Sequence, residues 1–104
     1  MDIFSIKFKY DALKSKRNQE KHGISLEEAK ALWAEPGIEI QARTVDESRF
    51  LRIGKLGAEY YSCVFTIREH SIRLISARRS RINEEKIYEE KIENEKAAKK
   101  NQGE

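Results

Sequence analysis

Three arginines lie close together in the last third of the chain, and their side chains suit the binding of phosphate. They are Arg78, Arg79 and Arg81, and they follow an apolar run that begins at Leu74. A guanidinium presents a planar fork of N–H donors that matches the oxygens of a phosphate or a carboxylate. We expect Ser71–Arg79 to be a buried central strand that delivers two of these guanidiniums to the edge of the core.

Alternation along this strand predicts two faces, each apolar in the middle and each ending in arginine. The alternative to phosphate binding is a pair of salt bridges from Arg78 and Arg79 to the following helix, with Glu84 and Glu85 as the first partners. The two predicted faces are Ile72, Leu74, Ser76, Arg78 and Arg73, Ile75, Ala77, Arg79.

A second group of cations falls on one side of the first predicted helix, which has almost no apolar face. At the helical period these side chains share an arc of about 140°. His22 lies at the C-terminal end, where the helix dipole favours a protonated imidazole, and it is a candidate for proton transfer or phosphate contact. The alternative is a solvated, lysine-rich surface. The residues on this side are Lys14, Arg17, Asn18, Lys21 and His22.

The clearest predicted strand, Ala58–Arg68, has one apolar and one polar face. Hydroxyls, a guanidinium and a tyrosine ring on the polar face suit contacts with RNA phosphates, 2′-hydroxyls and bases. The alternative is a sheet face that is open to water. The apolar face is Tyr61, Cys63, Phe65 and Ile67, and the polar face is Tyr60, Ser62, Val64, Thr66 and Arg68.

The composition limits the classes of protein that the chain can belong to. The 104 residues suit one domain, 38% of them are charged, and the net charge of +3 is a mild indication of an anionic partner. The single Cys63 excludes an intramolecular disulfide, and no spacing of Cys and His predicts a metal site or a cofactor. No stretch resembles a signal peptide or a membrane span, so we expect a cytoplasmic protein.

Periodicity and turn residues predict an α+β domain, an antiparallel sheet with two N-terminal helices and one C-terminal helix. A single domain over residues 1–99 and a disordered tail over 100–104 are expected. Asp11 caps the first helix, and Ser25 with Glu28 forms a capping box for the second. The predicted helices run from Asp11 to about Lys21, from Ser25 to Pro36 and from Arg81 to about Lys99, and the last has the apolar stripe Ile82, Ile87, Tyr88 and Ile92. The predicted strands are Ile3–Phe8, Ile38–Thr44, Arg49–Gly54, Ala58–Arg68 and Ser71–Arg79. A turn is expected at Asp46–Ser48 and a hairpin at Lys55–Gly57.

Several short motifs, in this order and spacing, resemble the BrnT family of toxins from type II BrnT–BrnA toxin–antitoxin systems. The resemblance covers about residues 4 to 90. Tyr10 stands where the family usually has Trp, Ser80 replaces a usual Ala, and Glu85 replaces a usual basic residue. The motifs are Phe8-Lys9-Tyr10-Asp11, Asn18 to Ala29 (NQEKHGISLEEA), Arg49 with Gly54, Arg73 to Arg79 (RLISARR), and Glu84 with Tyr88.

This resemblance implies a compact RelE-like fold and a ribonuclease that halts translation by cutting RNA. It also implies a BrnA-like ribbon-helix-helix antitoxin, with operator DNA bound only through that antitoxin. A homodimer or a toxin–antitoxin hetero-oligomer is expected, without a membrane partner. The functional candidates that the resemblance implies are Lys21, His22, Arg49, Arg68, Arg78, Arg79, Glu84 and Tyr88, to which the charge and strand patterns add Lys14, Arg17 and Tyr60.

Such an enzyme needs no metal, because the 2′-hydroxyl beside the scissile phosphate can act as the nucleophile. The protein then supplies a base, cations for the charge that develops on the phosphorus, and an acid for the leaving oxygen. Two other functions use the same residues: a non-catalytic nucleic-acid-binding module, and an interaction domain whose arginines only pair with glutamates. The candidates for proton transfer are His22, Lys21 and Glu84, and those for charge stabilisation are Arg49, Arg78 and Arg79.

Overall fold

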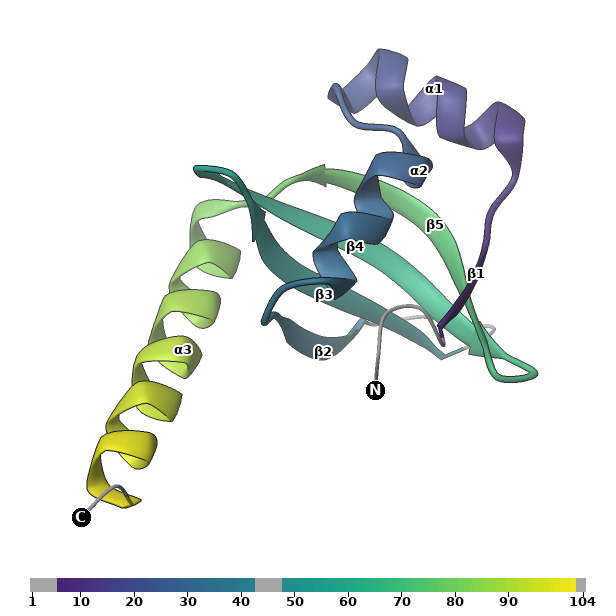
Figure 1. Ribbon diagram of the computed structural model, residues 1–104. Helices are drawn as coiled ribbons and strands as arrows, with labels where there is room; N and C mark the ends of the chain where they lie inside the picture. Colours follow the sequence, from purple (N-terminus) through teal and green to yellow (C-terminus); the bar gives the residue numbers. More distant parts are fainter. Residues whose placement is uncertain (1–5, 43–47, 103–104) are drawn as a thin grey trace.

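The computed structural model describes residues 6–42 and 48–102, which form a five-stranded sheet with helices packed on it (Figure 1). The strand order is β1-β5-β4-β3-β2, in which β1 runs parallel to β5 and all other neighbours are antiparallel. The elements are β1 (Lys7–Lys9), α1 (Ala12–His22), α2 (Leu26–Ala29), the 3-10 helix η2 (Lys30–Trp33), β2 (Ile38–Ala42), β3 (Arg49–Leu56), β4 (Glu59–Arg68), β5 (Ser71–Arg79) and α3 (Ile82–Gln102).

The predicted α+β class is confirmed, with two helices before the long strands and one after them. The sheet is mixed rather than purely antiparallel, because the edge strand β1 pairs in parallel with the last strand. Strand β5 has its predicted bounds, whereas β3 continues to Leu56 and α3 to Gln102. Residues 3–5, 43–44 and 46–47, which belong to predicted strands and a predicted turn, lie outside the described residues.

Local capping interactions define the ends of the first two helices. Asp11 accepts a hydrogen bond from the backbone N–H of Lys14 at 3.0 Å, and Gly23 ends α1 in the left-handed region, with φ of 75°. Ser25 and Glu28 form the predicted capping box at the start of α2. The second predicted helix consists of two short pieces, α2 and η2.

Helix α1 docks on the rest of the protein through polar side chains, which explains why it has almost no apolar face. Its buried residues are Ser15 and Asn18. The Ser15 hydroxyl oxygen accepts a hydrogen bond from the backbone N–H of Leu26 at 2.9 Å. The Asn18 amide donates to the carbonyl oxygens of Ile24 and Ala77, at 2.7 and 2.8 Å, and accepts from the Ala77 N–H at 3.2 Å. Buried backbone groups that would otherwise lack partners therefore hold α1 in place.

The apolar core lies between the sheet and the segment formed by α2 and η2. Phe65 of β4 is buried at its centre, together with Leu32. The Trp33 ring meets Phe65 edge-on, with centroids 5.1 Å apart, and Phe8 in the same way at 5.4 Å. Phe50 stacks on Phe65 from the neighbouring strand. Strand β4 therefore packs against Leu32 and Trp33 of η2.

A β-bulge interrupts the pairing of β4 with β5. Val64 aligns with Ser76, but the next residue, Phe65, aligns with Leu74, so Ile75 is an extra residue in β5. A bulge shifts the two-residue alternation of side chains by one position. The predicted faces of β5 are therefore wrong beyond the bulge.

Four predictions of burial are wrong for identifiable reasons. Ser62 and Thr66 are buried, whereas both interpretations of the polar face, RNA contact or open water, left them exposed. They are buried because Ser62 donates a hydrogen bond to Glu84 of α3 and Thr66 to a backbone carbonyl. Ile67, assigned to the core, is 57% exposed near the tip of the β4–β5 hairpin. Ile82, assigned to the apolar stripe of α3, is 72% exposed at the first position of that helix.

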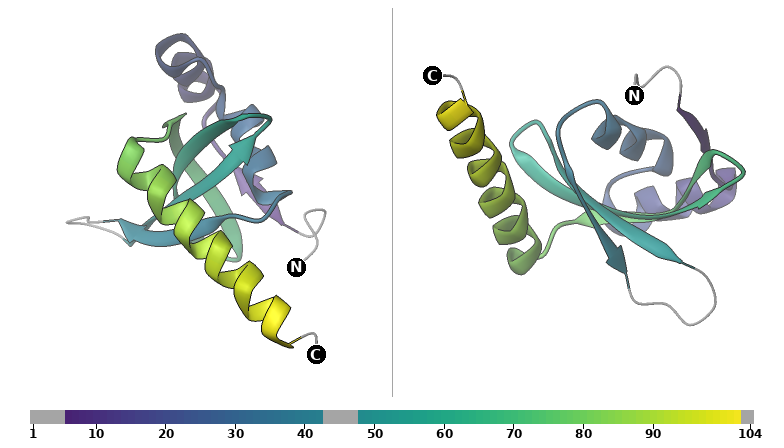
Figure 2. Two further views of the ribbon diagram at one scale, coloured as in Figure 1. Left: turned by 90° about the vertical axis from the view of Figure 1, so that its left-hand side faces the viewer. Right: turned by 90° about the horizontal axis from the view of Figure 1, so that it is seen from below.

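Helix α3 leaves the end of β5, and its hydrogen bonds and ring contacts with the sheet come from Glu84, Tyr88 and Glu89 in its first half. Figure 2 shows that its C-terminal end projects beyond the strands, away from α1 and α2. Mixed charges cover this helix, which is why the part that leaves the sheet remains compatible with water.

Cys63 lies in the core, and its thiol is expected to be chemically protected. Burial raises the pKa of this thiol from its ordinary value of 9.0 to about 12. Because the thiolate is the reactive form, alkylation of the folded protein at mildly alkaline pH is expected to be about 1000-fold slower than in urea. Mass spectrometry after timed iodoacetamide treatment measures the two rates, and equal rates would contradict the assigned burial.

Candidate active site

Arg78 and Arg79 leave the end of β5 on opposite faces of the sheet. Arg79 aligns with Tyr61 and Arg78 with Ser62. Ala77, which shares the face of Arg79 by alternation, belongs to the core under the helices. Arg79 therefore lies on the face that carries α1 and α2, and Arg78 lies on the face that carries the start of α3.

Arg78 is bound by a network at the start of α3. Its guanidinium donates to both carboxylate oxygens of Glu84, at 2.7 and 2.8 Å. The Arg81 backbone N–H and the Ser62 hydroxyl also donate to Glu84, at 2.8 and 3.0 Å. The hydroxyl oxygens of Ser62 and Ser80 lie 2.7 Å apart. The salt-bridge alternative considered for Arg78 is therefore confirmed.

These bonds determine the charge of Glu84. Burial alone would raise the pKa of its carboxyl, but the hydrogen bonds from Arg78, the Arg81 backbone and Ser62 outweigh it and lower the pKa to about 2. The same pairing raises the pKa of Arg78. A carboxylate with so low a pKa is a weak base, so the geometry favours a positioning role for Glu84 over the predicted proton transfer.

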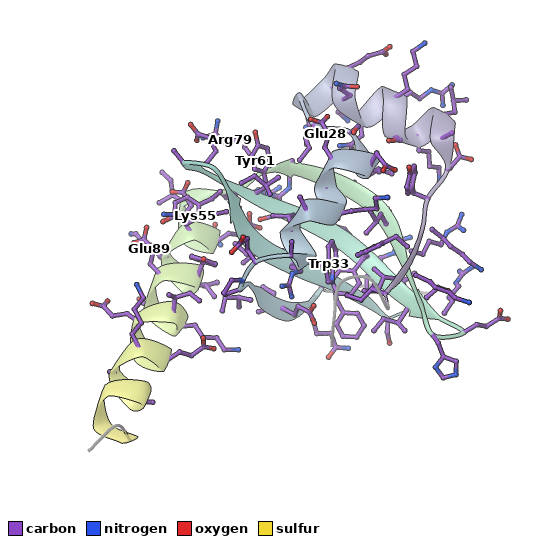
Figure 3. All side chains as sticks on the ribbon, in the orientation of Figure 1. Glu28, Trp33, Lys55, Tyr61, Arg79 and Glu89 are labelled. Atoms are coloured by element: carbon purple, nitrogen blue, oxygen red, sulfur yellow. The ribbon has the colours of Figure 1, made fainter. Side chains whose placement is uncertain are left out.

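Arg79 is held much less firmly than Arg78. It pairs with Glu59, not with Glu85, and both side chains of this pair are at least half exposed. Its guanidinium also lies over the Tyr61 ring, 5.8 Å from the centroid. Figure 3 shows Arg79 and Tyr61 together at the end of the sheet from which α3 departs. Exposed pairs of this kind contribute little stability and exchange partners easily, so Arg79 is accessible to an anion.

Helix α1 runs alongside β5 in the same direction. At the start of α1, the pKa of Asp11 is lowered mainly by the hydrogen bond from the Lys14 backbone and to a lesser degree by the charge of Arg73 on β5. Further along, Asn18 binds the backbone of Ala77. Figure 1 shows the C-terminal ends of α1 and β5 on the same side of the molecule.

This arrangement brings two predicted site residues toward Arg79. His22 follows Asn18 by one helical turn, about 6 Å along α1, and Arg79 follows Ala77 by two residues, about 7 Å along β5. Lys21 and His22 occupy the last turn of α1, and His22 is partly buried. Lys21 and His22 therefore lie toward the same end of the molecule as Arg79, on the helix-bearing side of β5.

The family model described as "Ribonuclease toxin, BrnT, of type II toxin-antitoxin system" matches residues 10–84. The chain belongs to this family. No curated protein matches it. The BrnT match contains α1, both arginines and Glu84, but it ends before most of α3.

The described residues of this BrnT chain bear on membrane insertion and metal binding. None of its helices over residues 6–42 and 48–102 has the length and apolar character to span a membrane. Within the same ranges, no group of three or more His, Cys, Asp or Glu side chains is placed to hold a metal ion.

Two predicted residues of this BrnT chain meet on the opposite face, next to α3. The rings of Tyr60 and Tyr88 are edge-on, with centroids 5.5 Å apart. The Tyr60 hydroxyl donates to Glu89 at 2.7 Å, and this bond is the main cause that raises its pKa to about 12. A cavity of about 320 Å³ lies beside them, lined by Lys55, Tyr60, Tyr88, Glu89, Ile92, Glu93 and Lys96. Figure 3 labels two of these lining residues, Lys55 from β3 and Glu89 from α3.

The remaining predicted residues do not join either group. Arg49 begins β3 and Arg68 ends β4, so both lie at the end of the sheet far from Arg79. Lys14 and Arg17 are exposed on α1. The structure does not bring the eleven predicted residues together.

Several residues of the site were not predicted from the sequence. Glu59 and Tyr61 contact Arg79, and Ser62 and Ser80 complete the network of Glu84. The sequence placed Asn18 on the cationic side of the first helix but did not predict that its amide binds the backbone of Ala77. Only a complete prediction of strand register would have found these contacts, because each joins residues on different elements.

Proposed function

We propose that the chain is a metal-independent endoribonuclease that inhibits translation by cutting RNA, with its active site at the end of β5. Arg79, His22 and Lys21 form this site. Membership of the BrnT ribonuclease toxins supports the reaction class. The observation that carries the location is the pairing of Asn18 with the Ala77 backbone, which aligns the last turn of α1 with the exposed Arg79.

Each residue has a defined part in the proposed reaction. The Arg79 guanidinium binds the scissile phosphate and stabilises the charge of the phosphorane. The His22 imidazole exchanges the proton of the 2′-hydroxyl or of the leaving 5′-oxygen. Lys21 adds positive charge beside them.

Arg78 and Glu84 support this site without touching the phosphate. Their bidentate pair joins the start of α3 to β5 and fixes the backbone that carries Arg79. Tyr60 and Tyr88 lie on the opposite face, where their rings suit stacking with an RNA base next to the cleavage site.

A type II toxin implies a cognate antitoxin, and we infer a BrnA-like ribbon-helix-helix protein acting in the cytoplasm. The antitoxin binds the toxin, and operator DNA is contacted through the antitoxin alone. Exposed positive charge on α1 and at Arg79 supports binding of an acidic segment over the active site.

Cleavage of RNA is expected to proceed undiminished in excess EDTA and to leave 2′,3′-cyclic phosphate and 5′-hydroxyl ends. The reason is that the 2′-hydroxyl is the nucleophile and protein cations stabilise the charge. Gel analysis of a labelled RNA, with mass spectrometry of the ends, measures both features.

The Arg79→Ala protein, purified identically, controls for contaminating nucleases. Activity that disappears with chelator and returns with Mg²⁺ would contradict the proposal. RNA binding without any cleavage would instead favour a non-catalytic module.

A further inference from the structure

The parallel pairing of β1 with β5 gathers cations that are far apart in the sequence. Lys9 aligns with Arg73, and Phe8 aligns with Ile72. Phe8 and Ile72 pack against the core under the helices. By alternation, Lys7, Lys9 and Arg73 therefore share the opposite face. We call these three residues the basic strand surface.

Among the described residues, the favourable charge on this surface is limited to the Asp11 carboxylate, whose pKa Arg73 lowers as a lesser cause. Like charges that face each other across neighbouring strands are unfavourable, and Lys9 and Arg73 are such a pair. Across residues 6–42 and 48–102, no carboxylate forms an ion pair with Lys7, Lys9 or Arg73. The carboxylate of Asp11 is engaged in capping α1.

Further polar groups extend this surface across the sheet. Arg73 aligns with Thr66 on β4, and Lys7 aligns with Ser71, which in turn faces Arg68. Lys7, Lys9 and Arg68 are exposed, so a ligand can reach them. The hydroxyls of Thr66 and Ser71 are buried beneath this surface, so the cations alone face solvent. Cations in adjacent rows suit a phosphate backbone better than a single small anion.

We propose that the basic strand surface binds the phosphate backbone of the RNA substrate at a distance from the cleavage site. The inference rests on the proposed ribonuclease function and adds a second contact for the same RNA. Arg73 lies six residues before Arg79 on β5, about 20 Å away. The phosphates bound there are several nucleotides from the scissile one, so this surface contributes to affinity and not to chemistry.

The salt dependence of RNA binding tests the proposal. For single-stranded RNA, each phosphate that the protein neutralises adds about 0.7 to the magnitude of the slope of log K against log salt. The Lys9→Thr/Arg73→Thr protein is therefore expected to bind more weakly at low salt, with a slope smaller in magnitude by about 1.4. Fluorescence anisotropy with a 2′-O-methyl oligonucleotide that spans the protein measures binding without cleavage.

A matched control removes the same charge elsewhere. Lys86 and Lys91 are exposed on α3, and Lys86→Ala/Lys91→Ala is expected to keep the wild-type slope. Thermal unfolding of both double variants checks the fold, and removal of the Lys9–Arg73 repulsion is expected to leave the melting temperature unchanged or higher.

The outcomes separate this inference from the proposed function. A reduced slope in the strand variant alone, with an unchanged kcat at saturating RNA, supports the basic strand surface. A wild-type slope in that variant overturns it while leaving the ribonuclease assignment intact. A wild-type protein that neither binds the oligonucleotide at low salt nor cleaves RNA overturns both.

Discussion

Replacing Arg79 by alanine is expected to slow RNA cleavage about 10²–10³-fold while changing the free energy of unfolding by less than about 0.5 kcal/mol. The loss is large because one charge-stabilising donor at the phosphate disappears. The effect on stability is small because the ion pair of Arg79 with Glu59 is exposed on both sides. Single-turnover cleavage rates and urea unfolding of the same preparation measure the two quantities.

Two further variants make this experiment specific. Arg79→Lys is expected to recover little activity, because an ammonium replaces the planar fork with a point charge. Arg81→Ala removes an exposed arginine two residues away and keeps the backbone N–H that binds Glu84, so it is expected to remain active. Full activity of Arg79→Ala, or equal losses in both alanine variants, would show that Arg79 does not have the proposed role.

Replacing Glu84 by alanine is expected to lower the free energy of unfolding by about 3–5 kcal/mol. The substitution leaves the Arg78 guanidinium, the Arg81 N–H and the Ser62 hydroxyl without their common acceptor in a largely buried place. Urea denaturation measures the change, and a double-mutant cycle with Arg78→Ala measures the coupling between the two side chains. A loss of less than about 1 kcal/mol would show that the network does not stabilise the fold.

The same carboxylate makes stability depend on pH in a defined direction. Its folded pKa of about 2 lies below its ordinary value of 4.5, so the folded state favours the ionised form. The stabilisation is complete above about pH 4.5 and is lost as the pH falls toward 2, by about 3 kcal/mol in all. The Glu84→Gln protein, which cannot titrate at this position, is expected to show a correspondingly smaller loss of stability over this interval.

Arg78 and Arg79, which are neighbours in the sequence, have different environments in the structure. From the sequence they are two equivalent guanidiniums at the end of one strand. In the structure Arg78 is part of a mostly buried support, whereas Arg79 remains at the surface in an exposed pair with Glu59. A single extra residue in β5, upstream of both, determines which face each one occupies.

The sequence by itself predicted the features that depend on nearby residues. The caps at Asp11 and Ser25 and the bounds of β5 follow from hydrogen-bonding and conformational preferences that act over a few positions. The BrnT motifs also lie in the sequence, and they indicate the family without reference to the fold.

Only the tertiary structure decided the relations between distant segments. The parallel partner of β1, the docking of Asn18 on Ala77 and the role of Ser62 join positions that are far apart in the chain, by 59 residues for Asn18 and Ala77. Alternation predicts faces only while the register is continuous, and the bulge at Ile75 interrupts it. These contacts depend on which chain segments pack together, and a local pattern of residues carries no information about that choice.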